Sequence, residues 1–343
     1  MFRITVLALL TIISNFTVLG QATHKERYHQ SFAAQHQMLN GDSAINFSKA
    51  VFLTENCFHN GQLNYSVFKK DINEIVVQLQ DFIARYDMNA FKTAGNWAAF
   101  TFITDGIASN DYTPYSYDFE DYFAEKDMTK MFVTKLMKTR SGNCHSLPYF
   151  YKILCDELGA QAHLAIAPNH VYIKHLSEKN QWTNVELTNA TFPENKHIIK
   201  DLGVSEKAMQ NKVYLEPLTA KESIAMTLFD LANNYEFQFG VDSFYLSILD
   251  TALQYFPKCI PLLMNKSNYF LAVAELEEKK AQPNLDFVLE MKKRQALIDE
   301  KITELGHEEM SAELEQELTK FMEKEKKKQD KKKQKNNHQK SKS

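Results

Sequence analysis

Residues 141–146 of this chain are Ser-Gly-Asn-Cys-His-Ser, and the segment that they open has the apolar spacing of a helix. Apolar side chains recur at intervals of three and four residues, at Leu147, Tyr151, Leu154, Cys155 and Leu158. Gly159 then supplies a helix stop. The sequence therefore predicts a helix over 144–158. It places Cys144 in the first turn, where the helix dipole and open backbone N–H groups lower the pKa of a thiol.

Three strand-like segments follow this helix. They cover residues 161–167, 170–176 and 182–187, and Pro168-Asn169 forms the turn between the first two. His170 opens the second segment, and Glu186 lies on the third. Adjacent strands can hold these two side chains as cross-strand neighbours. We therefore predict an α+β core in which the carboxylate fixes the tautomer of the imidazole ring.

The order Cys144, His170, Glu186 is what a thiol nucleophile requires. A thiol attacks a carbonyl after a base has taken its proton, and an acid orients that base. We predict these three roles for the three residues. We expect the Cys144 backbone amide to hold the oxyanion of the intermediate, and Gly142 and Asn143 to line that cleft, because they leave backbone N–H groups open to a substrate.

Two aromatic residues, Trp97 and Tyr172, are further candidates for the cleft, although core packing is the commoner role of such side chains. The triad residues have structural alternatives too, since a single helical cysteine is usually a small core residue. Three other histidines are weaker candidates for the base. His145 is expected on another face of the helix, His163 at the far end of its strand from the turn, and His175 on the opposite face of the strand from His170. The four cysteines form no Cys-x-x-Cys pair, so we expect no metal and no cofactor.

Three motifs occur in a fixed order: Ser-Gly-Asn-Cys144-His-Ser, Asn169-His170-Val-Tyr-Ile173 and Trp182-Thr-Asn-Val-Glu186-Leu-Thr188. Over residues 126–191 they resemble the transglutaminase-like superfamily, and its bacterial branch with a short Cys-to-His interval most of all. The resemblance implies a papain-like α+β core whose Cys-His-acid triad cleaves or exchanges amide bonds. Some members of the family are inactive binding modules. Most carry aspartate where this chain has Glu186.

Helical spacing dominates the rest of the chain. Before the core it is found at 43–53, 67–86, 89–102 and 126–138, whereas the polar, turn-rich segment 105–121 is expected to be irregular. We divide the chain into a signal peptide (1–20), a transglutaminase-like domain (21–215), an all-α region (216–306) and a charged helix with a Lys-rich disordered tail (307–343).

The all-α region carries a pattern similar to a tetratricopeptide repeat, at Leu228, Leu231, Ala232, Tyr235, Leu249, Ala252 and Pro257. Such units bury their apolar faces against neighbouring units, and only about one and a half are present here. Two interpretations stay open. The region is a groove for a protein or peptide partner, or it is a helical extension that packs on the catalytic core.

Arg3 precedes an apolar run, 4–19, that is typical of a secretory signal peptide cleaved before Gln21; a membrane anchor is the alternative. No later segment is apolar enough to span a membrane.

The sequence does not decide whether Cys57 forms a disulfide with Cys155 or with Cys259. The net charge of −3 gives no reason to expect nucleic acid as a partner.

Together these features predict an exported enzyme, periplasmic or secreted, that hydrolyses peptide or amide bonds rather than cross-linking them. Its substrate would be a peptide or protein. The alternative is a non-catalytic scaffold that binds a protein or peptide partner through its helical region. Labelling of the central cysteine by a thiol reagent separates these two hypotheses.

Overall fold

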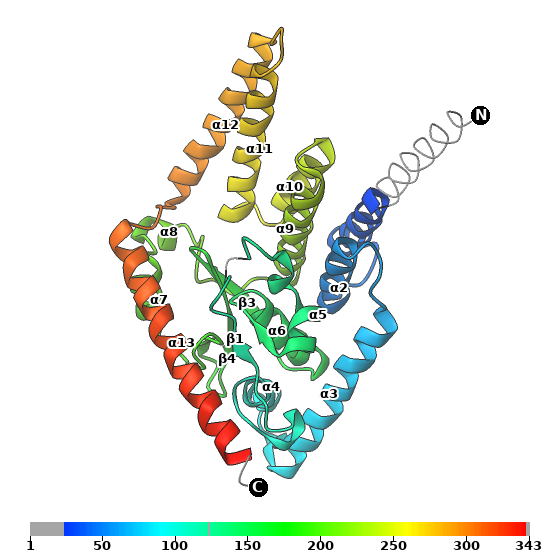
Figure 1. Ribbon diagram of the computed structural model, residues 1–343, viewed down its shortest axis with the longest axis vertical. Coiled ribbons are helices and arrows are strands. Elements are labelled where there is room, and N and C mark those ends of the chain that lie inside the picture. The colour runs from blue at the N-terminus through cyan, green and yellow to red at the C-terminus, as the bar shows by residue number, and fades with distance from the viewer. Residues whose placement is uncertain (1–23, 123, 341–343) are drawn as a thin grey trace, which may run out of the picture.

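The computed structural model describes residues 24–122 and 124–340, and the last nine of these by their backbone alone. The predicted signal peptide lies outside the described residues. The expected mixture of helices and strands is confirmed: the chain is mostly helical, with two small sheets near its centre and a helical C-terminal region (Figure 1). Within the described residues, no helix combines the length and the apolar character needed to cross a membrane.

A buried helix and an antiparallel sheet form the centre of the fold. The helix is α6 (Ser146–Glu157), whose residues up to Cys155 are all buried. The sheet has the order β3 (His163–Ala167), β4 (His170–Leu176) and β5 (Trp182–Val185). Ala167 pairs with His170 across a tight turn in which Asn169 has a φ of 54°. The helix and the three strands agree with the predicted order, although α6 begins two residues after Cys144.

A second, parallel sheet lies beside the start of α6. It consists of β1 (Ser116–Tyr117) and β2 (Ser141–Gly142), and Tyr117 pairs with Gly142. The segment 105–121 was expected to be irregular throughout, but its end forms β1. The predicted helix 126–138 is instead the short 3₁₀ turn η3 (Met128–Met131) followed by α5 (Val133–Thr139).

The N-terminal helices pack around this centre. Residues 24–40 are helical, followed by α2 (Phe47–Phe58), α3 (Tyr65–Arg85), the turn η1 (Met88–Ala90), α4 (Ala94–Thr104) and the turn η2 (Ala108–Asn110). Helix α2 begins later than predicted because the Asn46 side chain accepts a hydrogen bond from the Lys49 backbone and so caps it.

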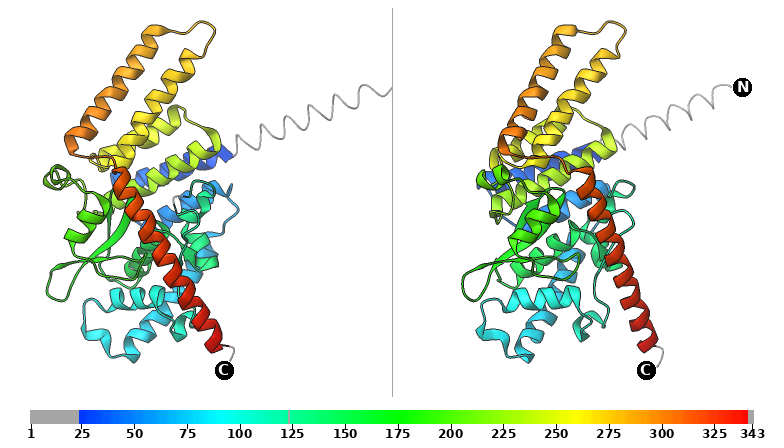
Figure 2. Two further views of the ribbon diagram at one scale, coloured as in Figure 1. Left: turned by 60° about the vertical axis from the view of Figure 1, so that its left-hand side comes forward. Right: turned by 90° about the vertical axis from the view of Figure 1, so that its left-hand side faces the viewer.

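The C-terminal half is helical. Its elements are α7 (Asn195–Leu202), α8 (Glu206–Gln210), α9 (Ala220–Phe239), α10 (Ser243–Tyr255), α11 (Ile260–Glu278), α12 (Leu285–Leu305) and α13 (Ala312–Lys340). One hydrophobic cluster extends from the N-terminal helices through α6 and the sheet into α9, α10 and the start of α11. Helix α9 therefore belongs to the same core as the site. The hairpin of α11 and α12 projects away from it (Figures 1 and 2).

Helix α13 differs from the prediction for the end of the chain. The Lys-rich segment was expected to be disordered, but the structure has one helix up to Lys340. This helix turns back from α12 and runs diagonally across the core (Figure 2). Lysine, glutamate and glutamine are good helix formers, and contacts of the first half of the helix with the core add to that preference.

Candidate active site

Cys144 lies between β2 and α6, and its two preceding residues fix that position. The buried Asn143 side-chain oxygen accepts hydrogen bonds from the backbone N–H groups of His145 and Ser146, each at 3.1 Å, and so caps the start of α6. A Cβ on Gly142 would lie 2.5 Å from the Ser146 hydroxyl oxygen. Neither residue lines the cavity at Cys144. The cleft role predicted for Gly142 and Asn143 is therefore replaced by a structural one.

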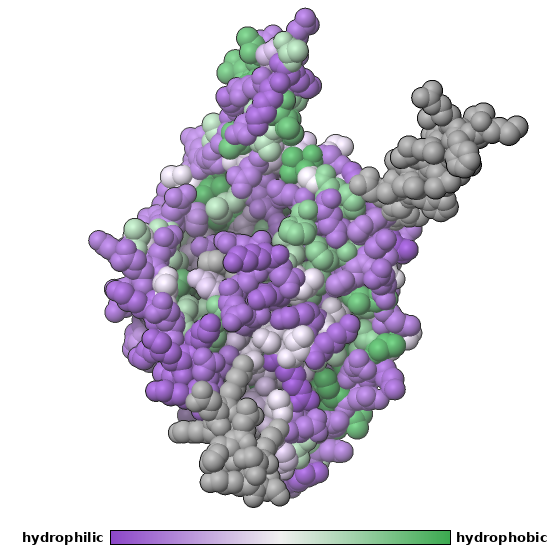
Figure 3. All heavy atoms as spheres, in the orientation of Figure 1, coloured by the Kyte–Doolittle hydropathy of each residue, from purple (hydrophilic) through white to green (hydrophobic). Residues whose placement is uncertain are grey.

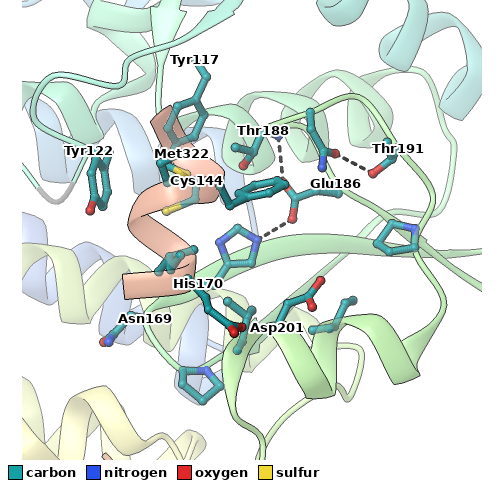
Figure 4. Close-up of a pocket in the computed structure, with 18 of the residues that line it drawn as sticks. Tyr117, Tyr122, Cys144, Asn169, His170, Glu186, Thr188, Thr191, Asp201 and Met322 are labelled. Carbon is teal, nitrogen blue, oxygen red and sulfur yellow. Dashed lines mark hydrogen bonds and ion pairs between the residues drawn. The ribbon is translucent and has the colours of Figure 1, made fainter. Parts of the chain in front are cut away.

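The three predicted triad residues meet in space. The His170 ring contacts the Cys144 thiol on one side. On the other side its Nε2 atom lies 2.6 Å from the Glu186 Oε2 atom. Because Nε2 is taken by the carboxylate, Nδ1 is the ring nitrogen left for the thiol. Figure 4 shows the sulfur beside the ring and Glu186 beyond it.

Glu186 comes one residue after β5 and is held by its own loop. Its backbone forms an isolated bridge with Thr191, and its Oε1 atom accepts a hydrogen bond from the Thr188 backbone N–H at 2.8 Å. Each carboxylate oxygen therefore has a donor. The side chains of His170 and Glu186 are only 14% and 15% exposed, so the pair is shielded from bulk water.

The electrostatics favour a charged ring beside a thiolate. Burial opposes ionisation of Cys144, but the hydrogen bond and charge of His170 outweigh it and lower the pKa of the thiol. Burial likewise opposes protonation of His170, but the Glu186 carboxylate and the Cys144 sulfur raise the pKa of the ring to about 10. Burial opposes the charge on Glu186 as well, and the ring beside it holds the pKa of the carboxyl below its ordinary value.

A cavity of about 290 Å³ opens over these three side chains. Tyr172, a predicted cleft residue, does not line it but stacks against the His170 ring, with centroids 6.1 Å apart and planes 9° from parallel. Trp97 is a correction, because it lies outside the cavity and stacks on Phe82 with centroids 4.7 Å apart. Both aromatic side chains pack against their neighbours, so Tyr172 supports the site from behind and Trp97 belongs to the core.

Tyr117 is a site residue that the sequence did not reveal. It lines the cavity from β1, and its hydroxyl is within hydrogen-bonding range of both the sulfur and the backbone amide of Cys144. Burial, together with the nearby thiol, holds the pKa of this phenol well above its ordinary value, so it stays protonated and can donate. No spacing pattern could have found it, because only the pairing of β1 with β2 brings it to the site.

The other three histidines have different partners. His145 is buried, with its Nε2 atom 2.9 Å from a carboxylate oxygen of Asp230 and its Nδ1 atom 3.1 Å from the Met131 carbonyl oxygen. The His163 Nδ1 atom lies 2.9 Å from a backbone carbonyl oxygen, and His175 is buried on the other face of β4. None of the three lines the cavity at Cys144.

All four cysteines are free thiols. Burial raises the pKa of Cys57 and of Cys259 to about 12 and raises that of Cys155 as well, whereas the partly exposed Cys144 has a lowered pKa. Within residues 24–122 and 124–340, no cluster of three His, Cys, Asp or Glu side chains could hold a metal ion.

Comparison with protein-family models, curated proteins and solved structures gives no match to this chain.

Proposed function

We propose that this protein is a transglutaminase-like cysteine enzyme that hydrolyses peptide or amide bonds. The observation that carries the proposal is the contact of the Cys144 thiol with a His170 ring whose Nε2 atom lies 2.6 Å from Glu186. We propose a papain-like core as well, and the order of Cys144, the buried helix α6 directly after it and the antiparallel meander β3–β5 supports that proposal. We also propose export, on the apolar run 4–19 of the sequence.

In the proposed reaction the Cys144 thiolate forms a bond to the carbonyl carbon of the substrate. His170, holding the proton, gives it to the leaving nitrogen as the carbon–nitrogen bond breaks. The Tyr117 hydroxyl and the Cys144 backbone N–H are the donors available to the oxyanion. Water then attacks the thioester carbon while His170 takes the proton of that water, and the carbon–sulfur bond breaks to release the acid and restore the Cys144 thiolate beside the charged ring. Glu186 keeps the ring oriented and charged in the first step.

We propose water as the acyl acceptor because an exported enzyme meets water far more often than a chosen amine. The test is the rate at which iodoacetamide alkylates Cys144, followed by peptide mass spectrometry. We expect His170→Ala to slow the alkylation at pH 7 by about tenfold or more, since the thiol loses the charge that lowers its pKa. The exposed residue His197 supplies the matched control, His197→Ala, which is expected to leave the rate unchanged.

An alkylation rate that is the same in the wild-type protein and in His170→Ala would contradict the proposal of an enzyme, because both proteins carry the same α13. It would favour the second candidate, a scaffold that binds a protein partner through its helices. One observation supports this alternative: large apolar side chains are exposed on the projecting hairpin of α11 and α12, with Leu285 70% and Leu289 69% exposed (Figure 3).

A further inference from the structure

Helix α13 covers the cavity that contains Cys144. Five of the residues that line this cavity come from it: Leu314, Glu317, Leu318, Phe321 and Met322. Leu314, Leu318 and Met322 recur every four residues, so they share one face of the helix. Met322 is 9% exposed and belongs to the hydrophobic core, and Figure 4 shows it beside Cys144. The catalytic sulfur therefore faces a side chain of the same chain, more than 170 residues further on.

The same face of α13 continues over a second cavity. This cavity, of about 580 Å³, shares Tyr117, Thr188 and Asn189 with the first, and α13 adds Glu325, Lys328 and Gln329 to its lining. The two cavities are thus neighbouring parts of one groove, and α13 lies along both. Two adjoining cavities of about 290 and 580 Å³ offer more room than a small amide fills, and they suit a polypeptide segment.

Gln329 makes two hydrogen bonds that identify the groove's polar edge. Its side-chain oxygen accepts from the Tyr117 backbone N–H at 2.9 Å, and its side-chain nitrogen donates to the Tyr117 carbonyl oxygen at 2.9 Å. On its other edge β1 pairs with β2, through hydrogen bonds from Ser116 and Asp118. The edge that Gln329 occupies is therefore the free edge of β1, and a carboxamide satisfies it as the peptide group of an added strand would.

The apolar contacts of α13 with the groove end at Met322. After Met322 the helix has no apolar residue up to Lys340, and most of its other side chains are charged or amide groups. Its N-terminal end is fixed differently, because the Gly306 carbonyl oxygen accepts from Ser205 and the His307 ring bonds the Tyr214 hydroxyl. Residues 308–311 between this anchor and α13 have no regular structure. Helix α13 can therefore leave the groove while α12 stays in place.

We propose that the groove beneath α13 is a polypeptide-binding site, and that α13 occupies it in the resting protein. An extended polypeptide would pair with the free edge of β1 at Tyr117 and pass its carbonyl group over Cys144, and α13 must move aside to admit it. This inference rests on the proposed function for the chemistry at Cys144. The proposal that α13 covers the groove rests only on the contacts that α13 makes.

Two full-length variants test the cover. Met322→Glu places a charge in the buried contact, and Gln329→Ala removes both hydrogen bonds to Tyr117. We expect Met322→Glu to speed alkylation of Cys144 by iodoacetamide about tenfold or more, and Gln329→Ala to speed it severalfold, because each raises the population in which α13 is open. The matched control is Gln316→Glu, which adds the same charge at an exposed position of the same helix and should leave the rate unchanged.

Competition in the Met322→Glu variant tests the class of ligand. We expect a synthetic peptide of residues 312–331, or denatured casein, to slow alkylation of Cys144, whereas N-acetylglycinamide at the same concentration does not. Equal protection by the small amide would overturn the polypeptide site. Because this assay measures access to the sulfur, it needs no enzymatic turnover.

The two proposals fail in different ways. Alkylation as slow in both α13 variants as in the wild type would overturn the cover, even if His170→Ala shows that the thiol is activated. Faster alkylation in both variants, with a rate that does not depend on His170, would support the proposal that α13 covers the groove. The same result would contradict the proposal that the protein is a cysteine enzyme. Gln329 is only partly buried, unlike Met322, so if Met322→Glu fails to fold, Gln329→Ala decides.

Discussion

Replacing Glu186 with glutamine changes one charge and little else at the site. The glutamine side chain keeps the size of the carboxylate, and its oxygen can still accept from the Thr188 backbone N–H. It no longer offers a negative charge to the His170 ring, whose Nε2 atom lies 2.6 Å from the carboxylate. For charges about 4 Å apart at an effective dielectric constant of about 20, this removes about 4 kcal/mol from the charged ring.

That loss is about a thousandfold in the equilibrium that moves the proton from Cys144 to His170. The visible effect is smaller, because a thiol with the ordinary pKa of 9.0 is still about 1% ionised at pH 7. We therefore expect alkylation of Cys144 at pH 7 to slow by about a hundredfold or more, because burial also opposes ionisation of this thiol. The rise of the rate with pH should also move upward, toward that of a free thiol.

The assay is the rate of iodoacetamide labelling from pH 5 to 10, measured for Glu186→Gln and for the control Glu216→Gln. Glu216 also lies near Tyr172 but makes no contact with the His170 ring. The control should keep the wild-type profile. An unchanged profile in Glu186→Gln would refute the reasoning, because it would mean that the carboxylate does not set where the proton sits.

Further predictions concern the residues around the triad. Tyr117→Phe should lower turnover by about a hundredfold if its hydroxyl holds the oxyanion, with Cys144 alkylation changed far less; equal losses in both assays would contradict that role. Gly142→Ala should cost about 1–3 kcal/mol in urea unfolding, because the new Cβ has no room; a cost near zero would contradict the packing. The raised pKa of His170 adds stability that is full below its ordinary value of 6.5 and is lost as the pH rises to about 10, and the lowered pKa of Glu186 adds stability that is lost as the pH falls below 4.5. The free energy of unfolding of wild type should therefore exceed that of Glu186→Gln most between about pH 4.5 and 6.5; a gap that widens toward pH 10 would contradict this sign.

Much of the site was predictable because its order is local. Helical spacing after Cys144 and the turn before His170 predicted α6 and β4, and these elements lie where expected. Two short strands joined by a turn can place His170 beside Glu186 in few ways. The catalytic roles of these residues stay predictions until the labelling experiments are done.

The neighbours of Cys144 were harder to assign from sequence. Gly142 and Asn143 were predicted to face a substrate, but Gly142 is a close packing contact and Asn143 is a helix cap. Glycine and asparagine suit both roles equally well, since both residues are common where the backbone turns sharply into a helix. Only the position of Ser146 and of the surrounding side chains decides between a cleft and a cap.

The sequence by itself predicted that Cys144, His170 and Glu186 belong to one site, and it predicted the helix and strands beside them, because each of these depends on spacing within a few residues. The tertiary structure alone decided that Tyr117 joins Cys144 and that α13 lies over both. Gln329 meets Tyr117 across 212 positions of the chain. The face of α13 that makes these contacts has few apolar residues and lies in a Lys- and Glu-rich segment. Its hydrophobic periodicity is therefore too weak to predict a buried face. Such contacts depend on how distant elements pack, and no local pattern records them.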